Sequence, residues 1–178
     1  MKQPTIFHLI SDIFTQRNVT CVLIGGFAVN YYKVTRQTVD IDFLITKDDF
    51  ERILSLLEEK GFKRDYTQEV FARLTGEKPY LMDIDFMFVD KETLDKIIQE
   101  GKQVCIAGRN FIVPCLNHLI ALKLHAIKYN PNVREYKDLA DILELIKINK
   151  LQVKNALFKN LCLKYGTEEL YNKILERI

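Results

Sequence analysis

Residues 21–45 read CVLIGGFAVNYYKVTRQTVDIDFLI, and this stretch decides which fold we expect. Its first four residues, 21–24, form a continuous apolar run that predicts a short buried strand. Gly25-Gly26 breaks the run, and residues 27–33 predict a helix that begins directly at the glycines. Residues 39–45 then alternate apolar with acidic side chains, which predicts a second strand with one distinctive face.

Two acids give that second strand its distinctive face. Asp40 and Asp42 are two residues apart, so their side chains share a face, with Cα atoms roughly 6.5–7 Å apart. Neighbouring carboxylates on a buried strand repel and lose hydration, and a bound cation offsets both costs. Such oxygen ligands suit Mg²⁺ or Mn²⁺, with substrate phosphates completing the coordination shell. The same spacing is also compatible with two acids in water at a strand end.

The glycines predict an anion site beside these acids. A strand that ends in Gly25-Gly26 and enters a helix exposes backbone N–H groups at the helix N-terminus, where phosphate binds favourably. A glycine pair alone would also serve an ordinary strand–helix turn. The order of glycine turn, short helix and returning acidic strand would place phosphate-binding amides next to metal-binding carboxylates.

A further pair of acids lies in residues 80–89, where Asp83 and Asp85 alternate with apolar residues. Both therefore face one side of a predicted strand. Phosphoryl-transfer sites commonly need an additional carboxylate, either for a two-metal cluster or to deprotonate the attacking hydroxyl. Either residue fits that role. Four acids on two strands of one apolar sheet favour a functional site over solvated surface.

The remaining pattern predicts an α+β protein with a mixed, mostly antiparallel sheet and flanking helices. Further strands are expected at 70–74, 103–107 and 110–113, and helices at 6–16, 47–60 and 91–99, with Thr46 and Asp90 as N-caps. After Pro114 the pattern is helical, with helices at 116–129 and 134–148, a loop at 130–132 and helical segments over 151–178. We therefore expect an α/β core in residues 1–114 and a helical segment in 115–178, packed on the core as a single compact unit.

Composition limits the classes of protein that this chain can be. Its 178 residues carry a formal charge of +2, which argues against a protein that coats DNA. No apolar run could span a membrane, and the N-terminus does not read as a signal peptide, so we expect a cytoplasmic protein. The four cysteines form no CxxC pair, and Cys21 and Cys105 lie in strand-like runs where buried free thiols are expected.

These motifs resemble the signature of the nucleotidyltransferase (DNA polymerase β-like) superfamily. The resemblance consists of residues 23–26, LIGG, a gap containing Arg36 and Thr38, and then DIDF at 40–43. Residues 119–126, LIALKLHA, and the Arg134-x-x-Lys137-Asp138-Leu139-Ala140-Asp141 run resemble helical motifs of abortive-infection toxin-type nucleotidyltransferases. The resemblance covers roughly residues 22–145 and implies the nucleotidyltransferase fold with a helical C-terminal segment.

The resemblance also implies roles for individual residues. It implies that Gly25 and Gly26 bind the triphosphate, together with Arg36 and Thr38 of the same signature. It implies that Asp40 and Asp42 bind Mg²⁺ or Mn²⁺, with Asp85 or, as the second choice, Asp83 as the third acid. It implies that Lys123 contacts nucleotide phosphates with assistance from Asp138.

The implied reaction is transfer of a nucleoside monophosphate from a nucleoside triphosphate, such as ATP, to a hydroxyl acceptor with release of pyrophosphate. The acceptor could be tRNA, a protein or a small molecule, and a toxin-like enzyme would have an antitoxin partner. The alternative is a non-catalytic nucleotide-binding or regulatory module of the same fold.

The helical residues allow other interpretations. Lys123 lies in an otherwise apolar helix, so it either reaches water or meets an anion. Arg134, Lys137, Asp138 and Asp141 have spacings that also permit ion pairs within one helix. His118 and His125 lie on nearly one helix face without an acid spaced as in a zinc motif, which favours structural or substrate-proximal roles over metal ligation.

Overall fold

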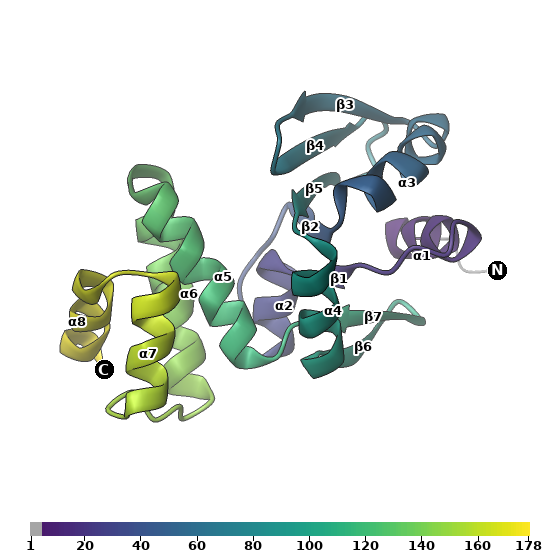
Figure 1. The fold of residues 1–178 in the computed structure, drawn as a ribbon. Helices are drawn as coiled ribbons and strands as arrows, with labels where there is room; N and C mark the ends of the chain where they lie inside the picture. The colour runs from purple at the N-terminus through teal and green to yellow at the C-terminus, as the bar shows by residue number, and fades with distance from the viewer. Residues whose placement is uncertain (1–4) are drawn as a thin grey trace. The chain divides into compact units, whose positions relative to one another are not determined.

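The computed structural model describes residues 5–178, and these contain a seven-stranded sheet and eight helices (Figure 1). Two compact units divide the described chain. The α/β unit contains the residues up to Ala28 together with Gln37–Pro114, and the helical unit contains Val29–Arg36 and Cys115–Ile178. Residues 29–36, which the sequence pattern placed with the α/β core, thus cluster with the C-terminal helices. The expected absence of a signal peptide concerns in part residues 1–4, which lie outside the described residues.

The sheet belongs to the α/β unit, and its strands follow the order β3-β4-β5-β2-β1-β7-β6. The pairs β2/β5 and β1/β7 are parallel, and the other pairs are antiparallel, which confirms the mixed, mostly antiparallel sheet. The strand bounds are β1 Val22–Leu23, β2 Asp40–Ile45, β3 Phe62–Thr67, β4 Phe71–Gly76, β5 Asp83–Phe88, β6 Lys102–Ile106 and β7 Arg109–Val113.

The helices α1 (Ile6–Gln16), α3 (Lys47–Glu59) and α4 (Lys91–Glu100) complete this unit. The two predicted N-caps are confirmed, because Thr46 accepts a hydrogen bond from the Asp49 backbone N–H, and Asp90 accepts one from that of Thr93. Helix α2 (Gly25–Tyr31) begins in the α/β unit and ends among residues of the helical unit.

Aromatic rings hold the sheet against α1 and α3. The Phe43 ring of β2 meets Phe14 of α1 at a centroid distance of 5.2 Å and lies 5.9 Å from Phe86 of β5. Phe50 of α3 contacts Phe86 and Phe88 at 5.1 Å each. Phe43 alternates with Asp42 along β2, so this packing uses the sheet face opposite the acids. A buried aromatic face therefore fixes the register that presents the acidic face.

The helical unit consists of α5 (Leu116–Tyr129), α6 (Pro131–Ile148), α7 (Ala156–Tyr165) and α8 (Glu168–Arg177). Helix α5 packs on α6 and α7, and α8 packs on α6 and α7. The predicted loop at 130–132 was too long, because α6 begins at Pro131, where the fixed φ of proline suits the first helical position. Thr167 caps α8 by accepting a hydrogen bond from the Leu170 N–H.

Three other local predictions differ from the structure. Strand β3 was missed, because its FKRDYT sequence is exposed after Phe62 and lacks an apolar alternation. The glycines form the first turn of α2 rather than preceding it. The prediction that Cys105 is buried was wrong, because β6 is an edge strand and this thiol is exposed. Among the described residues, none of the helices is both long and apolar enough to cross a membrane.

Candidate functional site

The pairing of β2 with β5 brings the two acidic motifs together. The strands are parallel, with Asp40 opposite Asp83 and Asp42 opposite Asp85. Residues directly opposite one another in a sheet point to the same side, so all four acids share one face. Two separate D-x-D motifs thus become one acidic surface because of strand register.

Three of the four carboxylates form a cluster. Oxygen atoms of Asp40, Asp42 and Asp85 all lie within 4.8 Å of one another. The fourth carboxylate, that of Asp83, pairs elsewhere: its Oδ1 accepts a hydrogen bond from the Gly76 backbone N–H at 3.1 Å. Oxygen ligands of one Mg²⁺ lie about 2.1 Å from the ion and hence up to about 4.2 Å apart, so small side-chain rotations would bring the three to coordination distance.

Gly25 lies against this cluster. Its φ of +61° is a left-handed conformation, and a Cβ added there would lie 1.8 Å from Oδ2 of Asp42. The backbone N–H of Ile24 also donates to the Asp42 carbonyl at 2.9 Å. Any side chain at position 25 would therefore be strained and would collide with the carboxylate. The glycine turn and the acidic strand thus lie next to each other, and the phosphate-binding and metal-binding roles expected for them stay predictions.

Thr38 orients Asp40 from the segment before β2. Its Oγ1 lies 3.0 Å from Oδ1 of Asp40 and 3.1 Å from the carbonyl oxygen of the same residue. A hydroxyl that donates to a carboxylate favours one rotamer of that side chain. Thr38 therefore acts on the cluster through Asp40.

Arg73 of β4 is a member of the site that the sequence analysis missed. It lies directly opposite Asp85 on β5 and donates from Nε to Oδ1 at 2.7 Å and from Nη2 to Oδ2 at 2.6 Å. Its Nη2 is also 3.7 Å from Oδ2 of Asp40. The hydrogen bond to Asp85 raises the pKa of the guanidinium above its usual value. Only the β4/β5 register reveals this contact, since Arg73 is twelve residues from Asp85 in the chain.

The helical unit gathers other residues that the sequence singled out. The Nζ of Lys123 on α5 lies 2.8 Å from Oδ1 of Asp138 and 2.7 Å from Oδ2 of Asp141, both on α6. Arg36 donates from Nη1 to the same Oδ2 of Asp141 at 2.8 Å. Asp138 and Asp141 thus pair with other segments rather than within their own helix. Lys123 is buried and meets anions, as one of its two interpretations required, but the anions are carboxylates of the chain.

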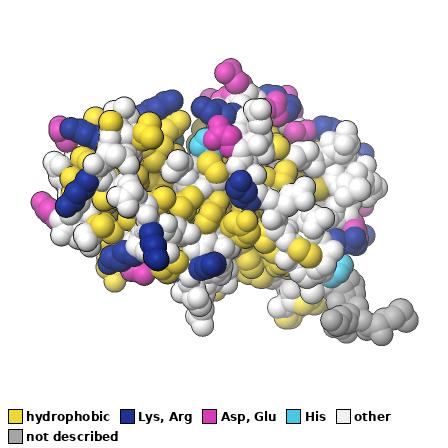
Figure 2. All heavy atoms as spheres, turned by 90° about the horizontal axis from the view of Figure 1, so that it is seen from below, with side chains coloured by type: hydrophobic (Ala, Val, Ile, Leu, Met, Phe, Trp, Pro, Cys, Tyr) yellow, Lys and Arg dark blue, Asp and Glu magenta, His cyan; other side chains and the backbone are white. Residues whose placement is uncertain are grey.

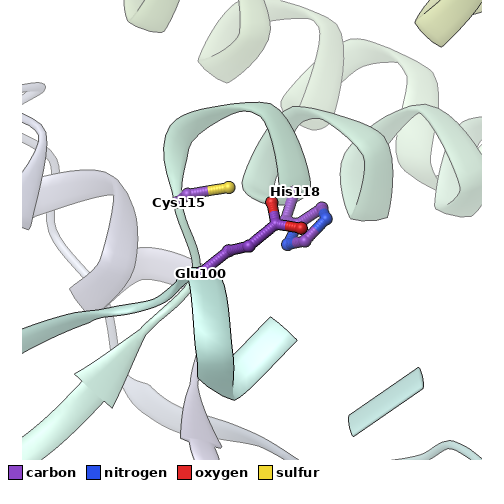
Figure 3. Close-up of side chains that lie close together, drawn as sticks. All are labelled: Glu100, Cys115 and His118. Carbon is purple, nitrogen blue, oxygen red and sulfur yellow. The ribbon is translucent and has the colours of Figure 1, made fainter. Parts of the chain in front are cut away.

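Both noted histidines lie on α5. Figure 3 shows Cys115, the N-cap residue of α5, and His118 in its first turn, and it also labels Glu100, the last residue of α4. His125 is exposed and its ring lies 4.5 Å from that of Tyr129. Partial burial, and then the charge of Lys128, lower the pKa of His125. The structural or substrate-proximal roles expected for the histidines stay predictions.

Comparison with known proteins gives the family and the fold. A family model described as uncharacterised nucleotidyltransferase matches residues 2–177. No curated protein matches the chain. Among solved structures, antibiotic-resistance factor ANT(2'')-Ia is similar with a TM-score of 0.59 and 17% identity, covering 96% of this chain and 89% of that one.

Two other structures show the same fold. The lincosamide antibiotic adenylyltransferase LnuA matches with a TM-score of 0.55 and 19% identity over 78% of this chain and 93% of that one. An antigenic nucleotidyltransferase-like protein from Paracoccidioides brasiliensis matches with a TM-score of 0.56 and 13% identity over 95% and 89%. The fold is that of nucleotidyltransferases, and because the family match spans nearly the whole sequence, this chain belongs to the uncharacterised nucleotidyltransferase family.

Proposed function

We propose that the protein transfers a nucleoside monophosphate from a nucleoside triphosphate to a hydroxyl acceptor, with Mg²⁺ or Mn²⁺ at the carboxylate cluster. The observation that carries the proposal is the convergence of Asp40, Asp42 and Asp85 within 4.8 Å, on the sheet face beside Gly25. The donor set consists of carboxylate oxygens, which is the set that hard divalent cations prefer. When bound, such a cation supplies charge neutralisation for the phosphates and lowers the pKa of the acceptor hydroxyl.

The residues of the cluster take different parts in this proposal. Asp40 and Asp42 hold the cation, and Asp85 either completes its coordination or accepts the proton of the attacking hydroxyl. Gly25 and Gly26 leave the backbone open for close approach of the triphosphate. Thr38 keeps Asp40 in its rotamer. Asp83 is not assigned a ligand role, because its carboxylate is hydrogen-bonded to the end of β4.

We assign a structural role to the ion-pair cluster of the helical unit, which consists of Lys123, Asp138, Asp141 and Arg36. For Lys123 to bind a phosphate, it would have to leave two carboxylates that it contacts at 2.7 and 2.8 Å while only 7% exposed. Separating a buried ion pair is costly, since each charge would lose its compensation. Lys123, Asp138 and Arg36 therefore join α5, α6 and the 29–36 segment in this proposal, rather than contacting nucleotide.

A non-catalytic nucleotide-binding module is the second candidate. It is favoured by one observation, which is that Arg73 already occupies both oxygens of Asp85. If that contact persists when nucleotide is bound, the third carboxylate is withheld from chemistry. Such a protein would bind triphosphate without releasing pyrophosphate.

Two classes of acceptor are to be distinguished. The structures of ANT(2'')-Ia and LnuA concern antibiotics, and they motivate small hydroxylated molecules. The resemblance to toxin-type enzymes motivates tRNA and an antitoxin partner. On the face shown in Figure 2, Lys and Arg side chains are interspersed with acidic and apolar ones rather than gathered in one basic area. That distribution, with the formal charge of +2, favours the small molecule.

The test is label transfer from each α-³²P-labelled nucleoside triphosphate, with Mn²⁺ or Mg²⁺, to tobramycin, lincomycin or total tRNA. We expect one acceptor class to be labelled, and Asp42→Asn to reduce the rate at least about a hundredfold. Asp95→Asn, which changes an exposed aspartate of α4, is the matched control and should retain the wild-type rate. Triphosphate binding without transfer to any acceptor would favour the non-catalytic module, and an active Asp42→Asn variant would contradict the proposed site.

A further inference from the structure

We infer that Arg73 is a displaceable counter-ion, which holds the carboxylate cluster together without metal and moves to the substrate phosphates when a divalent cation takes Asp85. The inference rests on the proposed function, because it requires that the cluster binds a cation. It adds a role for a residue that neither the sequence motifs nor the family match assigns.

Arg73 and a cation need the same oxygen atoms of Asp85. The guanidinium donates to both Oδ1 and Oδ2 of Asp85, at 2.7 and 2.6 Å. Asp85 also has an oxygen within 4.8 Å of oxygens of Asp40 and Asp42. A cation that takes Asp85 as a ligand must therefore replace at least one hydrogen bond from Arg73.

Asp85 and Arg73 differ in their exposure to solvent. The side chain of Asp85 is 9% exposed and that of Arg73 is 38% exposed. Asp85 is thus held by the sheet, whereas the guanidinium lies at the solvent-accessible margin. The guanidinium can be hydrated as soon as it separates, and a divalent cation replaces the positive charge that Asp85 loses, so the exchange leaves no buried carboxylate uncompensated. By contrast, Lys123 and its two aspartates have side chains no more than 9% exposed.

Strand register keeps a released Arg73 guanidinium beside the carboxylate cluster. Arg73, Asp85 and Asp42 lie opposite one another on β4, β5 and β2, so they form one row across the sheet. A released guanidinium remains anchored on this row, next to phosphates that would share the cation. Arginine binds phosphate through a pair of parallel hydrogen bonds, the same fork that it now offers to Asp85. One side chain therefore serves both states of the site.

The experiment measures Mn²⁺ binding by calorimetry in the wild type, Arg73→Met, Asp42→Asn and the control Arg64→Met, which changes an exposed arginine of β3. Removing a competitor for Asp85 should tighten Mn²⁺ binding by about tenfold, while ATP binding at saturating Mn²⁺ should weaken by about tenfold. Arg64→Met should match the wild type in both titrations. Weaker Mn²⁺ binding in Arg73→Met would overturn the inference, because Arg73 would then position Asp85 for the metal.

Thermal unfolding provides an independent readout. Without metal, Arg73→Met should have a lower Tm than the wild type, since the carboxylates repel one another, and Mn²⁺ should remove most of that difference. An equal loss with and without Mn²⁺ would indicate simple packing and overturn the inference. Unchanged ATP affinity would overturn the phosphate contact. If the wild type itself bound no Mn²⁺, the proposed function would fail together with the inference. The outcomes above, by contrast, would overturn only the role of Arg73.

Discussion

Aspartates meet basic side chains in both units of this molecule, with different results. In the helical unit, the buried Asp138 and Asp141 pair with Lys123, which is also buried, and with Arg36, which is partly exposed, so two carboxylates face two cations. In the α/β unit, Asp40, Asp42 and Asp85 converge on a partly exposed sheet face where Arg73 contacts two of them. The first arrangement compensates its charges internally, and the second gathers more carboxylates than guanidinium groups.

This difference separates structural acids from ligand-binding ones. A buried and balanced cluster gains nothing from an added cation, and losing one member leaves a charge stranded in the interior. A partly exposed cluster of acids can accept a cation from water without disturbing the core. The D-x-D motif of Asp40 and Asp42 and the D-x-x-D motif of Asp138 and Asp141 look alike in the sequence. We expect mutations at the D-x-x-D cluster to lower stability without affecting metal binding, and mutations at the D-x-D cluster to weaken metal binding.

The largest effect should follow from Lys123→Met. Removing the ammonium leaves two buried carboxylates undercompensated, so the free energy of unfolding should fall by about 3–5 kcal/mol. Urea denaturation monitored by circular dichroism measures it, and added Mn²⁺ should not restore the loss. Lys137→Met, at an exposed position on α6, should change stability by less than about 0.5 kcal/mol. If Lys123→Met lowered the free energy of unfolding by less than about 1 kcal/mol, the cluster of the helical unit would behave like a surface ion pair, and it would not differ from the carboxylate cluster in the way proposed.

Gly25→Ala should have the second-largest effect, lowering both the free energy of unfolding and the affinity for Mn²⁺. The strained φ should cost about 1–3 kcal/mol, and the collision with Oδ2 of Asp42 should also weaken Mn²⁺ binding. Gly108→Ala is the matched control, because Gly108 has a φ of +78° but nothing within 4 Å of an added Cβ. Gly108→Ala should cost stability and leave Mn²⁺ affinity intact. Equal Mn²⁺ affinities in the two variants would show that Gly25 does not shape the site.

Thr38→Val should give a smaller change confined to the acidic site. The loss of the hydroxyl contact with Asp40 should cost about 0.5–1.5 kcal/mol, seen as weaker Mn²⁺ binding more than as lower stability. Titration with Mn²⁺ and urea denaturation together separate the two quantities. Thr35→Val changes an exposed threonine and should be neutral in both. A Thr38→Val variant with wild-type Mn²⁺ affinity would mean that Asp40 needs no orienting hydroxyl.

The smallest expected effect concerns the rates at which the cysteine thiols react. Cys21 reports on the interior of the α/β unit and Cys162 on that of the helical unit. Burial raises the pKa of Cys162 to about 12, and burial also raises that of Cys21, so neither forms a reactive thiolate at pH 8. Cys105 is exposed on β6. Ellman's reagent at pH 8 should therefore label Cys105 rapidly, and label Cys21 and Cys162 only after unfolding. Rapid labelling of Cys162 in the native protein would mean that the α5/α7 packing opens readily.

Several parts of the fold followed from local patterns. The helix at residues 6–16, the N-caps Thr46 and Asp90 and the hairpin around Gly108 were all predicted, because capping residues and turn glycines act within a few residues. Strand β3 and the exposure of Cys105 were not. An edge strand has one unpaired side, and its exposure depends on which strand the sheet adds next, which is a long-range property.

The sequence by itself determined the acidic strand, its glycine turn and the second acidic strand, since alternation and glycine content express backbone geometry directly. The family match and the nucleotidyltransferase fold agree with that pattern. Only the tertiary structure decided that Asp85 rather than Asp83 joins the cluster, that Arg73 pairs with it, and that Lys123 is held by two aspartates. Those contacts depend on strand register and on helix packing, which bring together residues whose separation along the chain carries no local signal.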